Sequence, residues 1–294
     1  MTRTSTVAPQ ATALVLHGGA GVLADRAYDV EIAHLRNLAE EGRAALAAGA
    51  DALDVVCDMV RAMEVSGLYV AGKGSAPNRA GRYELDAAVM DGRARRAGAV
   101  SALEGFLSPV DAARAVMDHT PHVLLAGAGA AHFAREHGLA TVRDPEGYYI
   151  SAAAPDNRAI PTGTVGAVAL DASGALAAAT STGGTLNKVW GRVGDTPIIG
   201  SGTWADERVA VSCTGQGEFF MRANAAADVS GRVRYAGADL DAAVMGALDD
   251  VAALGGEGGI IAVDASGAVS ARYNSPGMKH AIVHADGRIT ASVK

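Results

Sequence analysis

The sequence predicts an α+β protein in which two mainly antiparallel sheets pack together and are covered by helices. Both halves of the chain mix segments of helical spacing with short apolar runs typical of strands. Residues 165–180 (VGAVALDASGALAAAT) and 258–273 (GGIIAVDASGAVSARY) each place a DASG turn between two strand-like runs. Hairpins of this kind join antiparallel neighbours. Apolar sheet faces are then buried against a second sheet and against helices.

The first elements of the chain have clear local signals. Residues 13–16 (ALVL) predict a buried strand that runs into the glycine turn HGGAG at 17–21. Residues 28–48 keep helical spacing. A second helix is expected to begin after Asp51, which suits an N-cap, with Asp54 in the capping-box position.

The remaining elements follow from spacing and from turn residues. In chain order we expect a glycine-rich loop at 67–82, a strand at 83–90, a helix at 109–118, a strand at 123–127, a helix at 130–137, an exposed loop at 138–163, a helix at 238–254 and a final hairpin at 279–293.

Composition excludes several classes of function. The chain has 294 residues, is 49% hydrophobic and 19% charged, and carries a net charge of −7 without a Lys/Arg cluster, which disfavours nucleic-acid binding. Cys57 and Cys213 are too few for a disulfide framework or a CxxC metal site. Residues 1–11 lack the apolar stretch of a secretory signal, and no apolar run is long enough to span a membrane. We therefore expect a cytoplasmic protein with no membrane partner.

Two glycine motifs imitate known sites. Residues 124–132 (LLAGAGAAH) resemble a dinucleotide fingerprint, but His132 stands at the third glycine position, so a tight strand–helix turn is the simpler interpretation. HGGAG resembles an esterase oxyanion loop, which would need a G-x-S-x-G elbow that the sequence lacks. The histidines form neither HExxH nor a Cys/His cluster, so we expect no catalytic metal.

Thr164 raises a chemical question because it begins a predicted strand directly after an irregular segment. A threonine that becomes the first residue of a chain can use its own α-amine, of pKa about 7.7–8, as general base. Gly163 would leave the preceding carbonyl unhindered for such a cut. Taken alone, a threonine in this position is more often a β-branched strand residue than a catalyst.

An ordered set of motifs makes the pattern specific. The set comprises HGGAG at 17–21, AGKGS at 71–75, ELDAAVMDG at 84–92, GTVGAVALD at 163–171, TSTGG at 180–184, Asn187-Lys188, GRVGD at 191–195 and CTGQGE at 213–218. Together, over nearly the whole chain, it resembles the plant-type asparaginase/isoaspartyl peptidase family of N-terminal nucleophile hydrolases.

The resemblance implies a fold and a maturation step. It implies a single αββα four-layer sandwich over residues 1–294, with self-cleavage between Gly163 and Thr164. The products would be an α subunit (1–163), ending in a flexible linker tail at 139–163, and a β subunit (164–294). These would stay together and associate as a dimer of αβ units.

The resemblance also implies catalytic roles. Thr164 would be nucleophile and, through its freed amine, general base, with Thr182 supporting it by hydrogen bonding. Thr214 and the backbone N–H of Gly215 would form the oxyanion hole.

Substrate contacts are implied in the same way. Arg192 would hold the substrate α-carboxylate, while Asp195 and Gly217 would receive the α-ammonium, with Gly215 also at the substrate. Without the resemblance, Arg192 and Asp195 could be a surface ion pair.

The implied activity is that of an amidohydrolase acting on β-aspartyl dipeptides and/or L-asparagine, releasing L-aspartate through a covalent β-aspartyl-enzyme. No cofactor is expected for catalysis. A structural sodium ion is implied, bound by backbone carbonyls of the 63–73 stretch. These are the carbonyls of Met63, Glu64, Ser66, Tyr69, Ala71 and Lys73.

Three departures from the family pattern, one of them the loop at 75–82 (SAPNRAGR), leave alternatives open. Val70 replaces a usual Asn close to the nucleophile, and Gln216 stands where a small residue or Thr is common. Cleavage rate and substrate preference are expected to differ accordingly. The alternatives are a glycosylasparaginase-like hydrolase, a poorly maturing paralogue that binds aspartyl ligands, and a nucleotide-dependent enzyme using the GAGAA turn.

Overall fold

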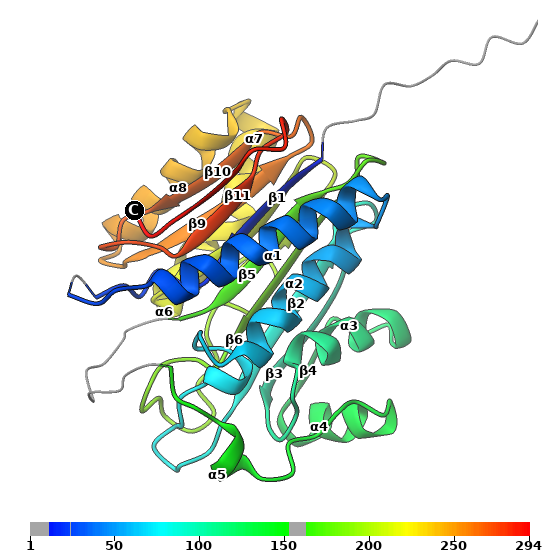
Figure 1. Cartoon of the computed structure of the whole chain (residues 1–294), viewed down its shortest axis with the longest axis vertical. Helices are drawn as coiled ribbons and strands as arrows, with labels where there is room; N and C mark the ends of the chain where they lie inside the picture. Colours follow the sequence, from blue (N-terminus) through cyan, green and yellow to red (C-terminus); the bar gives the residue numbers. More distant parts are fainter. Residues whose placement is uncertain (1–11, 24, 153–162) are drawn as a thin grey trace, which may run out of the picture.

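Two β-sheets lie face to face at the centre of the molecule (Figure 1). The computed structural model describes residues 12–23, 25–152 and 163–294. The larger sheet has the order β12 (Ile289–Ser292), β11 (His280–Val283), β1 (Ala13–His17), β5 (Val165–Leu170), β6 (Leu176–Thr182), β2 (Leu85–Asp91), β3 (Arg96–Leu103), β4 (Leu124–Ala126). The smaller has the order β10 (Val269–Tyr273), β9 (Gly258–Asp264), β8 (Val209–Gly215), β7 (Thr203–Ala205). Only the β3–β4 pair of these sheets is parallel.

Helices cover the outer face of each sheet. On the larger sheet lie α1 (Asp29–Ala47), α2 (Ala52–Ser66), α3 (Pro109–His119) and α4 (Gly127–Glu136), and on the smaller lie α6 (Gly217–Ala223), α7 (Ala225–Ala236) and α8 (Leu240–Ala253) (Figure 1). One apolar core fills each helix–sheet layer, and a third separates the two sheets. The predicted αββα sandwich is therefore confirmed.

The echoed DASG segments form the predicted hairpins, β5–β6 and β9–β10. In the first turn, one carboxylate oxygen of Asp171 accepts the N–H groups of Ser173 at 2.8 Å and Ala175 at 3.1 Å. Asp264 accepts the corresponding two N–H groups at 2.8 and 3.0 Å. The same Asp chemistry therefore closes both turns.

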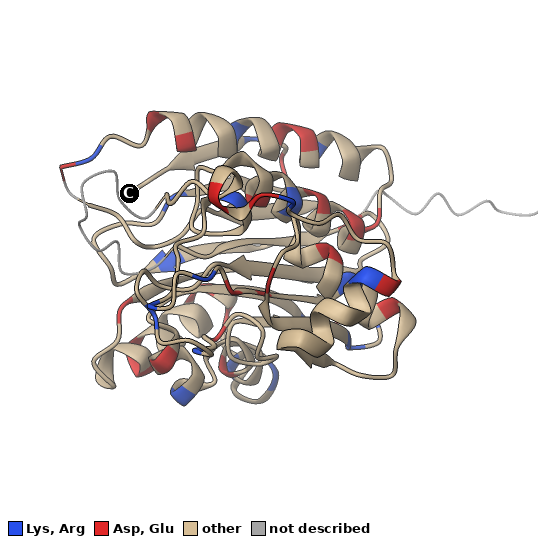
Figure 2. Cartoon of the chain, turned by 90° about the horizontal axis from the view of Figure 1, so that it is seen from below, with Lys and Arg blue, Asp and Glu red and all other residues tan. Residues whose placement is uncertain are grey.

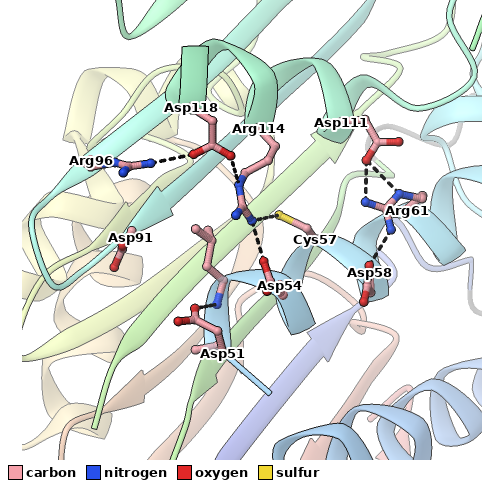
Figure 3. Close-up of polar contacts among 12 residues, drawn as sticks. Asp51, Asp54, Cys57, Asp58, Arg61, Asp91, Arg96, Asp111, Arg114 and Asp118 are labelled. Atoms are coloured by element: carbon pink, nitrogen blue, oxygen red, sulfur yellow. Dashed lines mark hydrogen bonds and ion pairs between the residues drawn. The ribbon is translucent and has the colours of Figure 1, made fainter. Parts of the chain in front are cut away.

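Helix α2 begins as predicted, because the side chain of Asp51 accepts the N–H of Leu53 at 3.0 Å. Asp54, predicted to complete a capping box, instead binds Arg114 of α3 at 2.9 Å (Figure 3). Arg114 also reaches the sulfur of Cys57 at 3.9 Å. The carboxylate of Asp54 therefore links two neighbouring helices.

Some elements differ from the sequence prediction. No element was predicted at the positions of β3, β7, β8, α6 and α7. Helix α4 begins earlier than predicted, at Gly127, and β2 begins at Leu85. Within the expected loop at 138–163, the structure contains a short helix, α5 (Pro145–Tyr148); the linker residues 153–162 lie outside the described residues.

Charged residues occupy the helices and loops far more than the two sheets, and in this view both signs are interspersed (Figure 2). In the described ranges, no helix has the length and apolar character needed to cross a membrane.

Candidate active site

Thr164 lies at the start of β5, in the middle of the larger sheet, and is 5% exposed. The β5–β6 register places Val165 opposite Ser181, which brings Thr164 beside Thr182 at the end of β6. The Thr164 hydroxyl donates to the Thr182 hydroxyl oxygen at 3.4 Å, and Gly184 N–H donates to the same oxygen at 3.0 Å. The structure thus places the hydroxyl of Thr182 in contact with that of Thr164, the residue it was predicted to support.

Gly163 is enclosed by two segments that are distant in sequence. A Cβ placed on Gly163 would collide with the side chain of Val70. On the other side, Gly19 of the HGGAG turn has φ +97°, and a Cβ there would lie 3.0 Å from the Cα of Gly163. The Gly163–Thr164 peptide is thus closely packed against both, and HGGAG contacts the site directly rather than serving only as a turn.

Several of the predicted residues line one small cavity of about 10 Å³. Its lining residues are Gly163, Thr164, Thr182, Gly184, Thr185, Arg192, Gly194, Asp195 and Gly215. A larger cavity of about 710 Å³ lies elsewhere, beside Tyr83 and Tyr149. We locate the site in the small cavity because the hydroxyls of threonines, the guanidinium of Arg192 and the buried carboxyl of Asp195 meet there. The volume of a cavity does not by itself indicate a catalytic site.

The two other predicted residues adjoin this cavity. Thr214, at the end of β8, is fully buried, and its hydroxyl oxygen accepts the N–H of Ala20 at 3.2 Å. Gly217 begins α6, and a Cβ there would lie 2.7 Å from a carboxylate oxygen of Asp195. A side chain at position 217 would therefore displace Asp195.

Asp195 and Arg192 do not form the surface ion pair considered above. Arg192 instead forms a bidentate ion pair with Glu218 of α6, in which two guanidinium nitrogens donate to the two carboxylate oxygens at 2.9 and 3.0 Å. Asp195 is 4% exposed, and within the described residues its Oδ2 has no hydrogen-bond partner. Burial raises the pKa of Asp195 to about 7, against the opposing effect of Arg192. An unpartnered acceptor at the cavity suits an incoming ammonium.

A buried polar chain between the sheets was not predicted. The Nε2 atom of His17 lies 2.9 Å from the Ser212 hydroxyl, which lies 2.8 Å from that of Thr180, to which Thr203 donates at 2.7 Å. Burial lowers the pKa of His17 to about 3, despite the opposing effect of the Thr164 backbone, which accepts from the imidazole, so the imidazole is neutral. These residues connect the two sheets close to Thr164, since a Cβ on Gly166 would collide with Ser212 and His17.

The predicted sodium-binding stretch is a tight turn between α2 and a short 3₁₀ segment at Gly72–Gly74. The carbonyl of Glu64 faces this turn, 2.5 Å from where a Cβ on Gly72 would stand. The Glu64 carboxylate points elsewhere, accepting from Ser108 Oγ at 2.5 Å and Val110 N–H at 3.0 Å. Burial raises the pKa of this carboxyl to about 8.

Most of the other implied carbonyls already accept one hydrogen bond. Met63 accepts from Ser66 Oγ at 2.8 Å, Tyr69 from Ala71 N–H at 2.8 Å, and Lys73 from Ile150 N–H at 2.8 Å. A carbonyl has two lone pairs, so each retains one. Neutral oxygens around a glycine turn fit a hard monovalent cation.

Comparison with known proteins identifies the family. A family model described as asparaginase matches residues 10–153 and 147–292. The chain belongs to this asparaginase family. It is 42% identical to an isoaspartyl peptidase of Salmonella typhimurium, over 95% of this chain and 97% of that protein. It is 41% identical to an isoaspartyl peptidase of Escherichia coli, over 95% of each chain.

Other relatives carry the second name found in this family. A plant-type L-asparaginase of Pyrobaculum calidifontis is 41% identical over 91% of this chain and 95% of that protein. For this asparaginase-family chain, the structure brings Thr164, Thr182, Arg192, Asp195 and Gly215 to one cavity. His17 and Ser212 are the site neighbours that sequence reasoning missed.

Proposed function

We propose that the chain cuts itself between Gly163 and Thr164, and that the new N-terminal threonine hydrolyses β-aspartyl dipeptides and/or L-asparagine. The observation that carries this proposal is the hydroxyl of Thr164, bound to Thr182 at 3.4 Å beside Gly163 and the cavity of Arg192 and Asp195. The names of the relatives support the same substrate classes.

In the proposed reaction, the freed α-amine of Thr164 takes the hydroxyl proton as Oγ attacks the substrate's β-carbonyl carbon. The backbone N–H of Gly215 and the Thr214 hydroxyl would stabilise the resulting oxyanion. Collapse breaks the C–N bond, and the amine returns its proton to the leaving nitrogen. Water then adds to the β-aspartyl ester, and L-aspartate leaves with Thr164 restored.

The substrate's charged groups would be held by opposite charges. Asp195 offers its unpartnered oxygen to the α-ammonium. Arg192 uses two of its five donors on Glu218, so other donors of the guanidinium remain for the α-carboxylate. Both groups line the same cavity as Thr164, so together they would fix the substrate relative to its hydroxyl.

The test is the intact mass and N-terminal sequence of the purified protein, with L-aspartate release measured in parallel. The wild type should yield fragments 1–163 and 164–294. Thr164→Ala should remain one uncut, inactive chain, whereas the exposed Thr141→Ala control should behave as wild type. Cleavage or turnover in Thr164→Ala would overturn the proposal. An uncut wild-type chain that binds L-aspartate would favour the binding-module alternative, for which Val70 against Gly163 is the motivating observation.

A structural sodium ion in the 63–73 turn is a second part of the proposal. The carbonyls of Glu64 and Tyr69 would be among those that hold it, where it would fix the turn that carries Val70. Thermal unfolding in sodium chloride and in choline chloride of equal ionic strength tests this. A higher midpoint in sodium is expected, and equal midpoints would count against the ion.

The assembly and location are also proposals. We propose a dimer of αβ units, to be measured by light scattering of the purified protein, and a cytoplasmic location without nucleic-acid or membrane partners. The interspersed charges and the two free, buried cysteines are compatible with this location.

A further inference from the structure

A second small cavity lies against Gly163, apart from the one that holds Thr182 and Asp195. It has about 10 Å³ and is also lined by Gly163. Its polar lining comes from Arg26, Tyr28, Glu31, Tyr69 and Lys279. Gly163 is therefore the residue that separates this charged cavity from the site of Thr164.

Lys279 is the unusual member of this cavity. It is 6% exposed, and the one hydrogen bond that its Nζ makes to described residues goes to the carbonyl of Gly21, at 3.3 Å. The ammonium also lies 5.0 Å from the centre of the Tyr28 ring. Because an ammonium has three donors, two N–H bonds of a buried cation are left without a described acceptor.

The other charges leave the cavity with an excess of one positive charge. Arg26 pairs with Glu31 at 2.7 Å, so these two charges offset each other. Burial lowers the pKa of Lys279 to about 8, with Glu31 opposing and Arg26 reinforcing the change, so most molecules carry the ammonium at pH 7. The hydroxyl of Tyr69 is already committed to the carbonyl of Glu31, at 3.1 Å. A single carboxylate would balance the remaining charge.

The chemistry of the proposed reaction directs a leaving group toward this cavity. Before cleavage, the nitrogen that becomes the α-amine of Thr164 is bonded to the carbonyl carbon of Gly163. In turnover the same amine must come within hydrogen-bond distance of the leaving nitrogen in order to protonate it. The leaving nitrogen, and the residue attached to it, therefore lie on the side that Gly163 occupies in the uncut chain.

We infer that Lys279, with Arg26, binds the free α-carboxylate of the leaving residue of a β-aspartyl dipeptide. This inference rests on the proposed function and names residues that would recognise its substrate. The leaving group of asparagine is ammonia, which has no carboxylate to fill the cavity. In the uncut chain the cavity has a volume of only about 10 Å³, too small for a carboxylate, which would therefore enter only after the bond to Gly163 is broken.

The test uses the mature enzyme, with complete cleavage verified by mass, and three substrates. These are β-aspartyl-leucine, its C-terminal amide and L-asparagine. Lys279→Met keeps the aliphatic bulk and removes the charge, and the exposed Lys294→Met is the matched control. Loss of a charge-assisted hydrogen bond should raise KM for the free acid about tenfold. KM for the amide and for asparagine should stay within about twofold of the wild type.

Glu31→Gln provides a second variant that moves the charge in the opposite direction. It should lower KM for the free acid alone, so the inference stays testable when Lys279→Met folds poorly. Equal changes for all three substrates, or unchanged KM for the free acid in both variants, would overturn the inference and leave the amidohydrolase in place. A cleaved wild type that turns over none of the substrates would overturn the proposed function, and the inference with it.

Discussion

The close packing of Val70 on Gly163 makes a quantitative prediction about the cleavage site. A Cβ added at position 163 would overlap the side chain of Val70, which is itself 5% exposed. Overpacking of this kind costs about 1–3 kcal/mol. Val70→Ala alone removes two buried carbons and should cost about 1.6 kcal/mol, together with a cavity contribution.

The effects of Gly163→Ala and Val70→Ala on the free energy of unfolding should not add, because the smaller side chain at position 70 makes room for the new methyl group. We expect about 2 kcal/mol for each single variant and about 2 kcal/mol for the double variant, hence a coupling energy of about −2 kcal/mol. Urea unfolding should be measured in a Thr164→Ala background, so that every protein remains one chain. In the cleavable background, Gly163→Ala should slow the cut, and Val70→Ala should partly restore it.

A coupling energy within about 0.5 kcal/mol of zero would refute this reasoning. It would mean that Gly163 and Val70 do not constrain each other. Because position 163 follows directly on residues outside the described range, a local shift of the chain is the physical alternative that additivity would reveal.

Three further predictions follow from the site. Because the pKa of Asp195 is about 7, the KM for substrate should rise as the pH falls below about 7 and the carboxylate is protonated. In steady-state kinetics, Asp195→Asn should lose this pH dependence and lower kcat/KM about 10- to 100-fold. Thr182→Val removes the oxygen that holds the hydroxyl of Thr164, so a time course of intact mass should show cleavage slowed about tenfold or more, and an unchanged rate would exclude the supporting role. Burial raises the thiol pKa of Cys57 to about 12, and it also raises that of Cys213. A thiol reagent at pH 8 should therefore label both cysteines only after denaturation. Rapid labelling of the native protein would contradict their burial.

Local signals explain which elements were predictable. The Asp171 and Asp264 turns carry their own hydrogen-bond chemistry, and Asp51 caps α2 by itself, so both hairpins and this helix start follow from short stretches. Helices α6 and α7 were not predicted, although Asn224, which ends α6 with a φ of +50°, is a residue type that often ends helices in this conformation. The partner of Asp54 was missed for a similar reason, since Arg114 lies on another helix.

The same division holds for the candidate site. The order of the motifs along the chain was enough to show the family resemblance, and it was this resemblance that implied roles for Thr164, Thr182, Arg192 and Asp195. Only the sheet registers and the α6 contact decided that they line one cavity, that Arg192 pairs with Glu218, and that Asp195 keeps an unpartnered oxygen.

The cavity of Lys279 was decided by the tertiary structure alone. Lys279 and Arg26 lie near opposite ends of the chain, and neither belongs to a motif that predicts a carboxylate site. They meet because Lys279 directly precedes β11, the antiparallel neighbour of β1. The N–H of Lys279 donates to the carbonyl of Gly19, and its carbonyl accepts the N–H of Gly18. Burial and charge balance depend on all neighbours at once, so the sequence determines the chemical groups, and only the packed fold determines which charges remain without partners.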